Sequence, residues 1–339
     1  MPQGILVTGG AGFIGSHFVR MWLERGLGPL VNVDKLTYAA SLDRLEEARE
    51  NPLHRFLHAD CGDLPLMEEV LDEFSPWAVI HFAALTHVDK SIAAPLSFLE
   101  ENTVATSRLL EASHRFFRRL PEGKKSRFRF LLVSTDEVYG SLSDLDPPLA
   151  EGAPYAPSSP YSASKAAADH FAQAYFRTYG LPILITHAAN NYGPGQHEEK
   201  LIPTVILSAA RQTPIGIYGD GKNKRDWLYV RDHGEALMGV LFSGRPGESY
   251  HIGAGVEKTN IEVVQEICAI LDRALPQGAS HLRHLTFVAD RPGHDRRYAM
   301  RTEKIRGEIG WRPKTPFSEG LAATVHWYLN QQGILPCNH

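Results

Sequence analysis

A glycine-rich turn directly after the first apolar run constrains the fold of this chain more than any other feature. The run at 5–7 leads into Gly9, Gly12 and Gly15, and apolar residues at helical spacing follow at once. Glycines in this pattern allow a tight turn, close approach of the backbone to a phosphate and close packing of helix on strand. A helix N-terminus also presents unpaired N–H groups and partial positive charge to anions. We therefore expect a strand–turn–helix unit that binds a dinucleotide.

Short apolar runs and helical stretches alternate through the first half of the chain. Runs at 78–80 and 130–133 are bounded by polar or turn residues, and the stretch 98–120 places apolar residues at helical spacing. Strands that alternate with helices of this length predict a parallel sheet with right-handed crossovers. The fold class that we expect is α/β, a Rossmann-type doubly wound parallel sheet.

The composition changes after about residue 190, where Gly and Pro become dense. Such a change predicts a second domain that is rich in loops. We expect a Rossmann domain over residues 1–190, with a returning segment near 226–250, and a smaller substrate-binding domain mainly over 191–339.

Charge and composition exclude several classes of protein. Lys and Arg total 35 against 39 Asp and Glu, a net charge of -4, whereas nucleic-acid binders usually carry a basic excess. The basic stretch 114–129 is typical of a solvated helix end rather than a phosphate site. No apolar run approaches the roughly 20 residues of a membrane helix, so we expect a cytoplasmic protein. Cys61, Cys268 and Cys337 are too few and too far apart for a disulfide framework or a zinc site, and we expect no metal.

Asp34 indicates which dinucleotide the turn binds. It ends the second expected strand, 19 residues after Gly15, where an acidic residue accepts hydrogen bonds from the adenosine ribose hydroxyls. A carboxylate there repels a 2′-phosphate, which favours NAD over NADP. The adjacent Lys35 leaves NADP as an alternative.

Tyr161 and Lys165 are four residues apart and therefore lie on one face of a helix. A tyrosine must lose its proton to act as a base near neutral pH, against a reference pKa of about 10. That difference amounts to about 4 kcal/mol, which one ammonium at about 4 Å supplies in an effective dielectric of about 20. The spacing predicts that Lys165 activates Tyr161.

Thr135, Asp136 and Glu137 follow the expected strand at 130–133 directly. In open α/β sheets, ligands bind beyond the carboxyl ends of the strands. Two adjacent carboxylates there serve either as a helix cap with a first-turn acid or as an acid–base pair tuned apart by its surroundings. Because a plain alcohol oxidation needs only the tyrosine and a hydroxyl, an extra pair indicates a further proton step such as elimination.

Nine motifs, spread over nearly the whole chain, carry a resemblance to a known family. They are VTGGAGFIGSH (7–17), VDKLTYA (33–39), HFAALTHVDKSI (81–92), STDEVYG (134–140), YSASK (161–165), NNYGP (190–194), EKLIP (199–203), RDWLYV (225–230) and RPGHDRRYA (291–299). In these motifs the chain resembles the extended short-chain dehydrogenase/reductases and, more narrowly, the dTDP-glucose 4,6-dehydratases. The Thr-Asp-Glu trio at 135–137 is the specific element, because epimerases and decarboxylases of the same fold usually lack it.

The resemblance implies a redox-neutral conversion of dTDP-glucose to dTDP-4-keto-6-deoxyglucose and water, with NAD held as a prosthetic group. Tyr161, assisted by Thr135 and Lys165, would take the proton of the sugar 4-OH. Glu137 would then remove the C5 proton, Asp136 would protonate the departing 6-OH, and hydride would return to C6. The family usually forms homodimers, here through the helix near 98–117 and the helix that bears Tyr161.

The resemblance also assigns binding positions, motif by motif. Residues expected at the cofactor are Gly9, Gly12, Phe13, Ile14, Gly15, Asp34, Lys35, Leu36, Thr37, Asp60, Cys61, Ala83, Ala84, Leu85, Thr86, Tyr161, Lys165 and Asn191. Residues expected at the substrate are Thr86, Thr135, Asn190, Lys200, Leu201, Gly216, Ile217, Tyr218, Arg225, Asn260, Asp290, Arg291, Pro292, Gly293 and His294. Arg225 and Arg291 suit the diphosphate, with a surface ion pair as the alternative. Tyr218 is expected either to stack on the base or to pack in the core of the second domain.

Several departures from the family pattern keep alternatives open. Leu85 and Thr86 stand where bacterial members often have Glu and Ser, and Glu101 stands where a Thr often contacts NAD. Because the form of the motif at 83–89 also occurs in relatives that act on UDP-glucose, a UDP-glucose 4,6-dehydratase is one alternative. A UDP-sugar epimerase or decarboxylase is another, which the acid–base pair at 136–137 disfavours. A non-catalytic NAD-sensing regulator is a third, disfavoured because both Tyr161 and Lys165 are present.

Overall fold

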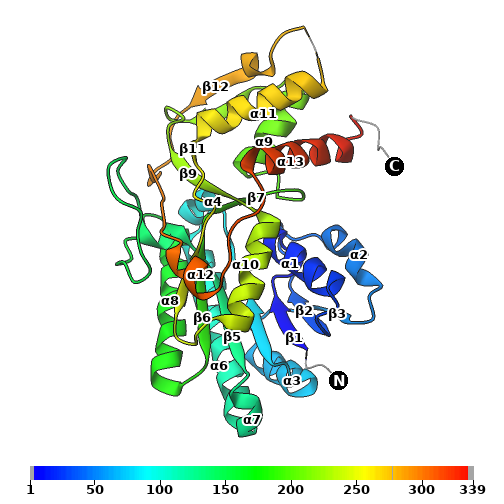
Figure 1. Cartoon of the computed structure of the whole chain (residues 1–339), viewed down its shortest axis with the longest axis vertical. Coiled ribbons are helices and arrows are strands. Elements are labelled where there is room, and N and C mark those ends of the chain that lie inside the picture. The colour runs from blue at the N-terminus through cyan, green and yellow to red at the C-terminus, as the bar shows by residue number, and fades with distance from the viewer. Residues whose placement is uncertain (1–3, 277, 335–339) are drawn as a thin grey trace.

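A seven-stranded parallel sheet forms the centre of the protein, whose computed structural model describes residues 4–276 and 278–334 (Figure 1). The strand order is β10-β6-β5-β4-β1-β2-β3, and every neighbouring pair is parallel. The sheet confirms the predicted Rossmann-type doubly wound fold. Its strands are β1 (Ile5–Thr8), β2 (Leu30–Asp34), β3 (His54–His58), β4 (Ala78–His81), β5 (Arg129–Thr135), β6 (Ile183–Ala188) and β10 (Ser249–Ile252).

Alternation of side chains along β1 explains why helices cover both faces of the sheet. Successive residues of a strand point to opposite faces. Ile5 and Val7 join the hydrophobic cluster beneath one helical layer, whereas Leu6 joins the cluster on the opposite face. The first layer includes α1 (Phe13–Glu24) and α10 (Val230–Ser243), and the second includes α3 (Leu64–Phe74), α6 (Ala105–Arg119) and α8 (Pro160–Tyr179).

The helix predicted over 98–120 is present but begins irregularly. α5 (Pro95–Phe98) runs into a π-helical turn, η2 (Leu99–Val104), which continues as α6. The apolar spacing over 98–120 was interpreted as one regular helix and did not predict this turn.

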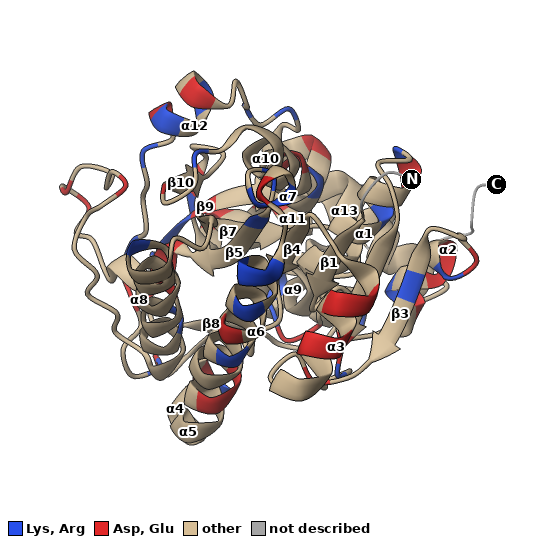
Figure 2. Cartoon of the chain, turned by 90° about the horizontal axis from the view of Figure 1, so that it is seen from below, with Lys and Arg blue, Asp and Glu red and all other residues tan. Residues whose placement is uncertain are grey.

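The basic stretch at the end of α6 is engaged in surface ion pairs. Arg115 lies 3.0 Å from Glu68, and Arg119 lies 2.7 Å from Asp72. Both acids belong to α3, and Figure 2 shows the acidic turns of α3 beside the charged face of α6. Each exposed pair contributes little to stability.

A second group of elements lies beyond one edge of the large sheet, at the top of Figure 1. It contains a three-stranded sheet, a two-stranded sheet and three helices packed around a separate hydrophobic core. These elements are β7 (Asn190–Tyr192), β9 (Lys224–Tyr229), β11 (Glu257–Thr259), β8 (Ile215–Tyr218), β12 (Leu285–Val288), α9 (Leu201–Ala210), α11 (Asn260–Ala274) and α13 (Phe317–Gln331).

The segment expected to return near 226–250 divides between the two groups of elements. Its start, in β9, pairs with β7 and β11 rather than with the large sheet. α10 then packs on α1, and β10 joins the large sheet beside β6. The chain therefore re-enters the Rossmann unit through α10 and β10.

Short elements complete the described chain, within which no helix combines the length and apolar character needed to span a membrane. They are η1 (Leu42–Leu45), α2 (Glu46–Arg49), α4 (Val88–Ala93), α7 (Glu122–Lys125), η3 (Asp136–Tyr139), η4 (His281–His284) and α12 (Glu303–Glu308).

Candidate active site

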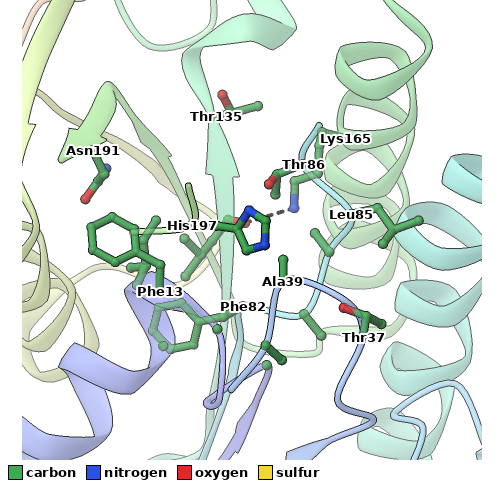
Figure 3. Close-up of a pocket in the computed structure, with 18 of the residues that line it drawn as sticks. Phe13, Thr37, Ala39, Phe82, Leu85, Thr86, Thr135, Lys165, Asn191 and His197 are labelled. Atoms are coloured by element: carbon green, nitrogen blue, oxygen red, sulfur yellow. Dashed lines mark hydrogen bonds between the residues drawn. The ribbon is translucent and has the colours of Figure 1, made fainter. Parts of the chain in front are cut away.

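A cavity of about 290 Å³ opens where the carboxyl ends of β1, β2, β4, β5 and β6 meet (Figure 3). β1 lies between β2 and β4, so the strand order reverses at this point. In doubly wound sheets such a switch point is the usual place for a ligand. In Figure 3, Phe13 and Asn191 lie across the cavity from Leu85 and Lys165.

The glycine turn forms the floor of the cavity and needs its glycines for steric reasons. Gly9 has a φ of 76°, and a Cβ there would lie 2.4 Å from the Ala83 nitrogen. A Cβ on Gly15 would lie 2.3 Å from the Gly9 carbonyl oxygen. Gly12 caps α1 without any side-chain hydrogen bond, so the first N–H groups of the helix keep their capacity for an anion.

Asp34 and Lys35 occupy the end of β2 in different ways. The Asp34 carboxylate accepts hydrogen bonds from the Ala11 nitrogen at 2.9 Å and the Leu36 nitrogen at 2.8 Å. These bonds fix the carboxylate at the cavity wall and leave further lone pairs for ribose hydroxyls. Lys35 forms ion pairs with Asp60, at 3.1 Å, and with Glu101. Its charge is therefore largely compensated, which weakens the case for a 2′-phosphate.

Tyr161 and Lys165 lie on the first turns of α8. The helix starts at Pro160 behind a capping box formed by Ser159 and Ser162, which fixes the position of its first turn. Lys165 is 3% exposed and donates to the Val133 carbonyl at 2.9 Å.

The electrostatics of Tyr161 differ from the simple picture of a phenol activated by one ammonium. Burial and the charge of Glu137 raise the pKa of Tyr161 above its ordinary value, while a hydrogen bond with Thr135 lowers it. Burial also lowers the pKa of Lys165, and the charge of Asp169 opposes that change. Activation of Tyr161 by Lys165 therefore stays a prediction for the complex with bound cofactor.

Thr135, Asp136 and Glu137 turn from the end of β5 into the short helix η3. Thr135 caps this helix, since its hydroxyl accepts from the Glu137 nitrogen at 3.3 Å, and it lies 3.3 Å from the Asp136 Oδ1 to which it donates. The capping role proposed from the sequence is thus real, but it belongs to the threonine. Asp136 and Glu137 both line the cavity.

The two carboxyl groups sit in unequal surroundings. Burial, with the neighbouring Glu137 charge, raises the pKa of Asp136 well above its ordinary value. Burial also raises the pKa of Glu137, but Arg225, Lys200 and Arg291 all oppose that rise. The arrangement favours a neutral Asp136 beside an ionised Glu137, which is the division between acid and base that an elimination requires.

The structure brings most predicted residues to this one cavity. All five predicted catalytic residues line it, with Asn190 and Lys200 from the substrate set. Leu36 and Asp60 lie behind the wall, bonded to Asp34 and Lys35 respectively. The cofactor set at the wall comprises Gly9, Gly12, Phe13, Ile14, Gly15, Asp34, Lys35, Thr37, Cys61, Ala83, Ala84, Leu85, Thr86, Tyr161, Lys165 and Asn191.

Other predicted substrate residues gather next to the cavity around Asp89. Tyr218 donates to Asp89 at 3.1 Å, and Arg291 lies 3.5 Å from the same carboxylate. His294 lies 2.6 Å from Asp290 and packs edge-on against Tyr218. Tyr218 is 40% exposed, so it does not pack in the core of the second group of elements. Its side chain remains available to a ligand.

The remaining predicted substrate residues lie in the second group of elements and in the loop before His294. Arg225 is 6% exposed and donates to the carbonyls of Lys224 and Asp295 at 2.8 and 2.9 Å, so it is not a surface ion pair. Leu201 and Asn260 begin α9 and α11, Gly216 and Ile217 lie in β8, and Pro292 and Gly293 form the turn before His294.

A group of residues at the rim of the cavity was not predicted as part of the site. Gln196, His197 and Glu199 follow the NNYGP motif, and the signals that they are near a ligand were their Gly- and Pro-rich loop and, for Glu199, its place at the start of the EKLIP motif. Glu199 accepts from Tyr38 at 3.1 Å and from Lys90 at 3.0 Å, joining three separate segments at the rim. The other missed wall residues are Val33, Ala39, Ala40, Ala59, Phe82, Glu101, Val133, Ser134, Ala188, Ala189 and His233.

His233 lies on α10 and reaches the cavity from there. No motif in the sequence marks it as a site residue. Its Nδ1 lies 2.9 Å from the Asn191 Oδ1, and burial lowers its pKa to about 3. A neutral His233 donates to Asn191, whose amide in turn donates to the Ala189 carbonyl at 2.9 Å. The predicted cofactor residue Asn191 is thereby held in one orientation.

The two cysteines in the described part of the chain form neither a disulfide nor a metal site. Cys61 and Cys268 are free and buried, and burial raises the pKa of the Cys61 thiol to about 12. Cys337 lies outside the described residues. Over the described ranges, no three His, Cys, Asp or Glu residues are close enough together to hold a metal ion.

Known proteins resemble this chain over nearly its whole length. The chain matches the family described as GDP-mannose 4,6 dehydratase over residues 6–324. It is 49% identical to a dTDP-glucose 4,6-dehydratase of Haemophilus influenzae over 331 residues, which cover 96% of this chain and 98% of the relative. The chain belongs to the dTDP-glucose 4,6-dehydratase family.

Two further relatives of this family agree in extent and shape. A dTDP-glucose 4,6-dehydratase of Xanthomonas campestris is 50% identical over 329 residues, covering 96% of this chain and 93% of the relative. A dTDP-glucose 4,6-dehydratase of Streptomyces venezuelae, solved with NAD and TYD bound, superposes with a TM-score of 0.89 at 42% identity, covering 97% of this chain and 98% of that one. Family membership therefore extends over both groups of elements.

Proposed function

We propose that this protein is an NAD-dependent dTDP-glucose 4,6-dehydratase, a hydro-lyase that converts dTDP-glucose to dTDP-4-keto-6-deoxyglucose and water. The observation that carries the proposal is the presence of Asp136 and Glu137 in the same cavity as Tyr161 and Lys165, above the glycine turn. An oxidation needs only the latter pair, whereas loss of water needs an acid and a base as well. The names of the relatives support dTDP-glucose as the substrate.

The residues of the cavity fit NAD. Gly9, Gly12 and Gly15 form a cradle that a Cβ would disturb, and the N-terminus of α1 keeps free donors for the pyrophosphate. Asp34 is buried and fixed at the place where the ribose hydroxyls are expected. Bound NAD+ supplies a hydride acceptor that later gives the hydride back, so no net oxidation occurs.

The side chains divide the proton transfers among them. Tyr161, hydrogen-bonded to Thr135, takes the proton of the sugar 4-OH. The positive charges of Arg225, Lys200 and Arg291 favour the ionised form of Glu137. Glu137 removes the C5 proton that the adjacent ketone has made acidic, and it returns a proton to C5 when C6 receives the hydride. Asp136, kept neutral by burial beside Glu137, gives its proton to the departing 6-OH. Lys165 stays charged and supports the phenolate.

Substrate is held between the cavity and the neighbouring cluster around Asp89. The buried Asn190 Oδ1 has no partner among the described residues and lines the cavity, as expected of a group that waits for a sugar hydroxyl. Lys200 lines the cavity beside it and donates to the Thr86 carbonyl at 2.8 Å. Lys200, Arg225 and Arg291 supply the positive charge for the diphosphate, and Tyr218 offers a ring to the base.

The proposal extends to the organisation of the protein. Residues 1–190, with the returning segment near 226–250, hold NAD, and residues 191–339 mainly hold the nucleotide sugar. The protein works in the cytoplasm as a homodimer formed by the helix near 98–117 and α8. Exposed apolar residues on these helices, Leu99 at 46% and Phe171 at 46%, support that interface.

Mass spectrometry of the products tests the proposal and its alternatives. The protein is incubated with dTDP-, UDP-, CDP- and GDP-glucose, first without added NAD. Loss of one water from dTDP-glucose alone is the expected result. Loss from UDP-glucose alone would move the activity to a UDP-glucose 4,6-dehydratase. No mass change with any substrate, even after NAD is supplied, would overturn the dehydratase proposal and favour an epimerase, a decarboxylase or a regulator.

A further inference from the structure

A buried polar network lies behind the catalytic residues and takes no part in the proton transfers described above. Its centre is Asp169, which is 0% exposed. One oxygen, Oδ2, accepts from the Ser134 hydroxyl at 2.9 Å and the Tyr155 hydroxyl at 3.1 Å, and lies 3.0 Å from the His187 Nε2. Three side chains from different parts of the chain therefore converge on one carboxylate oxygen and hold it in place. The other oxygen, Oδ1, has no partner in the described parts of the chain.

The network ties both ends of the catalytic segment to the rest of the fold. Ser134 precedes Thr135 and bonds to Asp169 on α8. Tyr139, the last residue of η3, lies 2.8 Å from the His251 Nε2 and 3.4 Å from the His187 Nδ1. The segment between these anchors contains the acid–base pair, so its position relative to α8 is set from two sides.

Asp169 also shares a helix face with the two catalytic residues of α8. Tyr161, Lys165 and Asp169 are spaced by four residues, so they follow one another along the same side of the helix. The charge of Asp169 raises the pKa of Lys165 against the lowering by burial, and it also contributes to the raised pKa of Tyr161. A carboxylate in this place opposes the effect of burial on the pKa of Lys165.

Resting on the proposed function, we propose that Asp169 is a positioning residue of the dehydratase site. Its buried carboxylate anchors the start of the catalytic segment through Ser134 and lies one turn beyond Lys165 on the same side of α8. His187 and Tyr155 hold the carboxylate in place from β6 and from the loop before α8. Asp169 touches neither substrate nor cofactor and acts only through its neighbours.

The test is the pH dependence of kcat/KM for dTDP-glucose in Asp169→Asn. This change removes the charge and keeps the shape and one acceptor oxygen. Activity rises with pH as Tyr161 loses its proton and falls as Lys165 loses its own. Without the Asp169 charge the pKa of both groups falls, so both limbs should move to lower pH. The expected shift is about 1 pH unit, the effect of one unit charge at roughly 10 Å in an effective dielectric of about 20.

The other charged and titratable groups near Tyr161, Lys165 and Asp169 are the same in the parent and in Asp169→Asn. Glu137 and Asp136 face Tyr161 from η3, and His81 faces Lys165 from β4. Tyr155, Tyr139 and His187 surround Asp169 from the loop before α8, from η3 and from β6. None of these is altered in Asp169→Asn.

Ser134→Ala is the matched control, because it removes one hydrogen bond to Asp169 and keeps the charge. Its kcat should fall while the two limbs stay where they are in the parent. Asp169→Ser provides a second removal of the charge, with room for a water in place of the carboxylate. Bound NAD and the unfolding temperature are measured for every variant before kinetics.

The outcomes separate this inference from the proposed function. If the parent does not dehydrate dTDP-glucose, the proposed function itself fails. If the parent does so and a charge-removing variant that retains NAD loses activity equally at every pH, Asp169 is only structural and the inference is wrong. Failure of both charge-removing variants to fold would likewise overturn it, because the carboxylate would then serve the fold rather than the site.

Discussion

Replacing the proposed C5 base, Glu137→Gln, should separate the hydride step from the elimination step. Gln has nearly the same shape as Glu but cannot accept the C5 proton. A general base contributes about 10²- to 10⁴-fold to a rate, so loss of water should slow by at least about 10²-fold, or about 2.7 kcal/mol in the barrier. The first step should survive, because the charge of Glu137 raises the pKa of Tyr161 and its removal makes the phenol easier to ionise.

Rapid mixing with dTDP-glucose measures both steps in one experiment. NADH absorbance should rise in Glu137→Gln and persist, whereas in the parent it should appear only transiently. Asp136→Asn is the matched control, since it leaves the C5 base in place and removes the acid that protonates the leaving hydroxyl. Loss of water at the parent rate in Glu137→Gln, or failure to form any NADH, would refute the assignment of the base.

Three further predictions follow from the same geometry. Tyr161→Phe should slow both NADH formation and loss of water by at least about 10²-fold, as expected for a lost general base; a variant with parental rates in a steady-state assay would contradict this. Gly9→Ala should purify with little NAD, because its Cβ would lie 2.4 Å from the Ala83 nitrogen, whereas Gly26→Ala, also at positive φ (59°) but with no atom within 4 Å, should keep its NAD. Asp136→Asn should raise the unfolding temperature by about 2 °C or more at neutral pH. Because the pKa of the parent carboxyl is raised in the fold, the unfolded chain releases this proton at lower pH than the folded protein does, and the parent loses stability as pH rises above the ordinary pKa of Asp. The gain should therefore shrink towards acid pH in a thermal scan, and a gain that grew there would disprove this prediction.

Features that depend on neighbours in sequence were predictable. The glycine turn, Asp34 at the end of β2, and the pair Tyr161 and Lys165 each rely on local spacing, because strands and helices convert such spacing directly into position. The alternation of apolar runs with helical stretches likewise gave the doubly wound sheet. Together, these local patterns predicted from the sequence where the cavity lies.

Features that depend on contacts between distant elements were not predictable. Asp169 on α8 contacts His187 on β6. Glu199 accepts hydrogen bonds from Lys90 and Tyr38, and these three residues belong to three different segments. No periodic pattern in the sequence predicts these contacts between distant residues. The placement of β9 in the three-stranded sheet has the same origin, since its pairing with β7 and β11 is decided by tertiary structure.

The unequal carboxyl groups show a second limit of sequence reasoning. The adjacent Asp136 and Glu137 predicted an acid–base pair, but the residue types alone did not show which is the acid, and only the family resemblance assigned that role to Asp136. Burial raises the pKa of both groups, and the difference between them comes from the charges around Glu137, where Arg225, Lys200 and Arg291 favour the ionised form. These three cations come from distant parts of the chain, so their common effect appears only when the structure brings them together.

The most direct test of the central claim is the fate of a deuterium placed at C4 of dTDP-glucose. In the proposed mechanism, hydride leaves C4 and returns to C6 of the same sugar without exchange with water. After incubation in ordinary water, the dehydrated product should carry the deuterium in its C6 methyl group, as located by NMR. A product with deuterium still at C4, or one that has lost it to solvent, would contradict the proposed dehydratase mechanism.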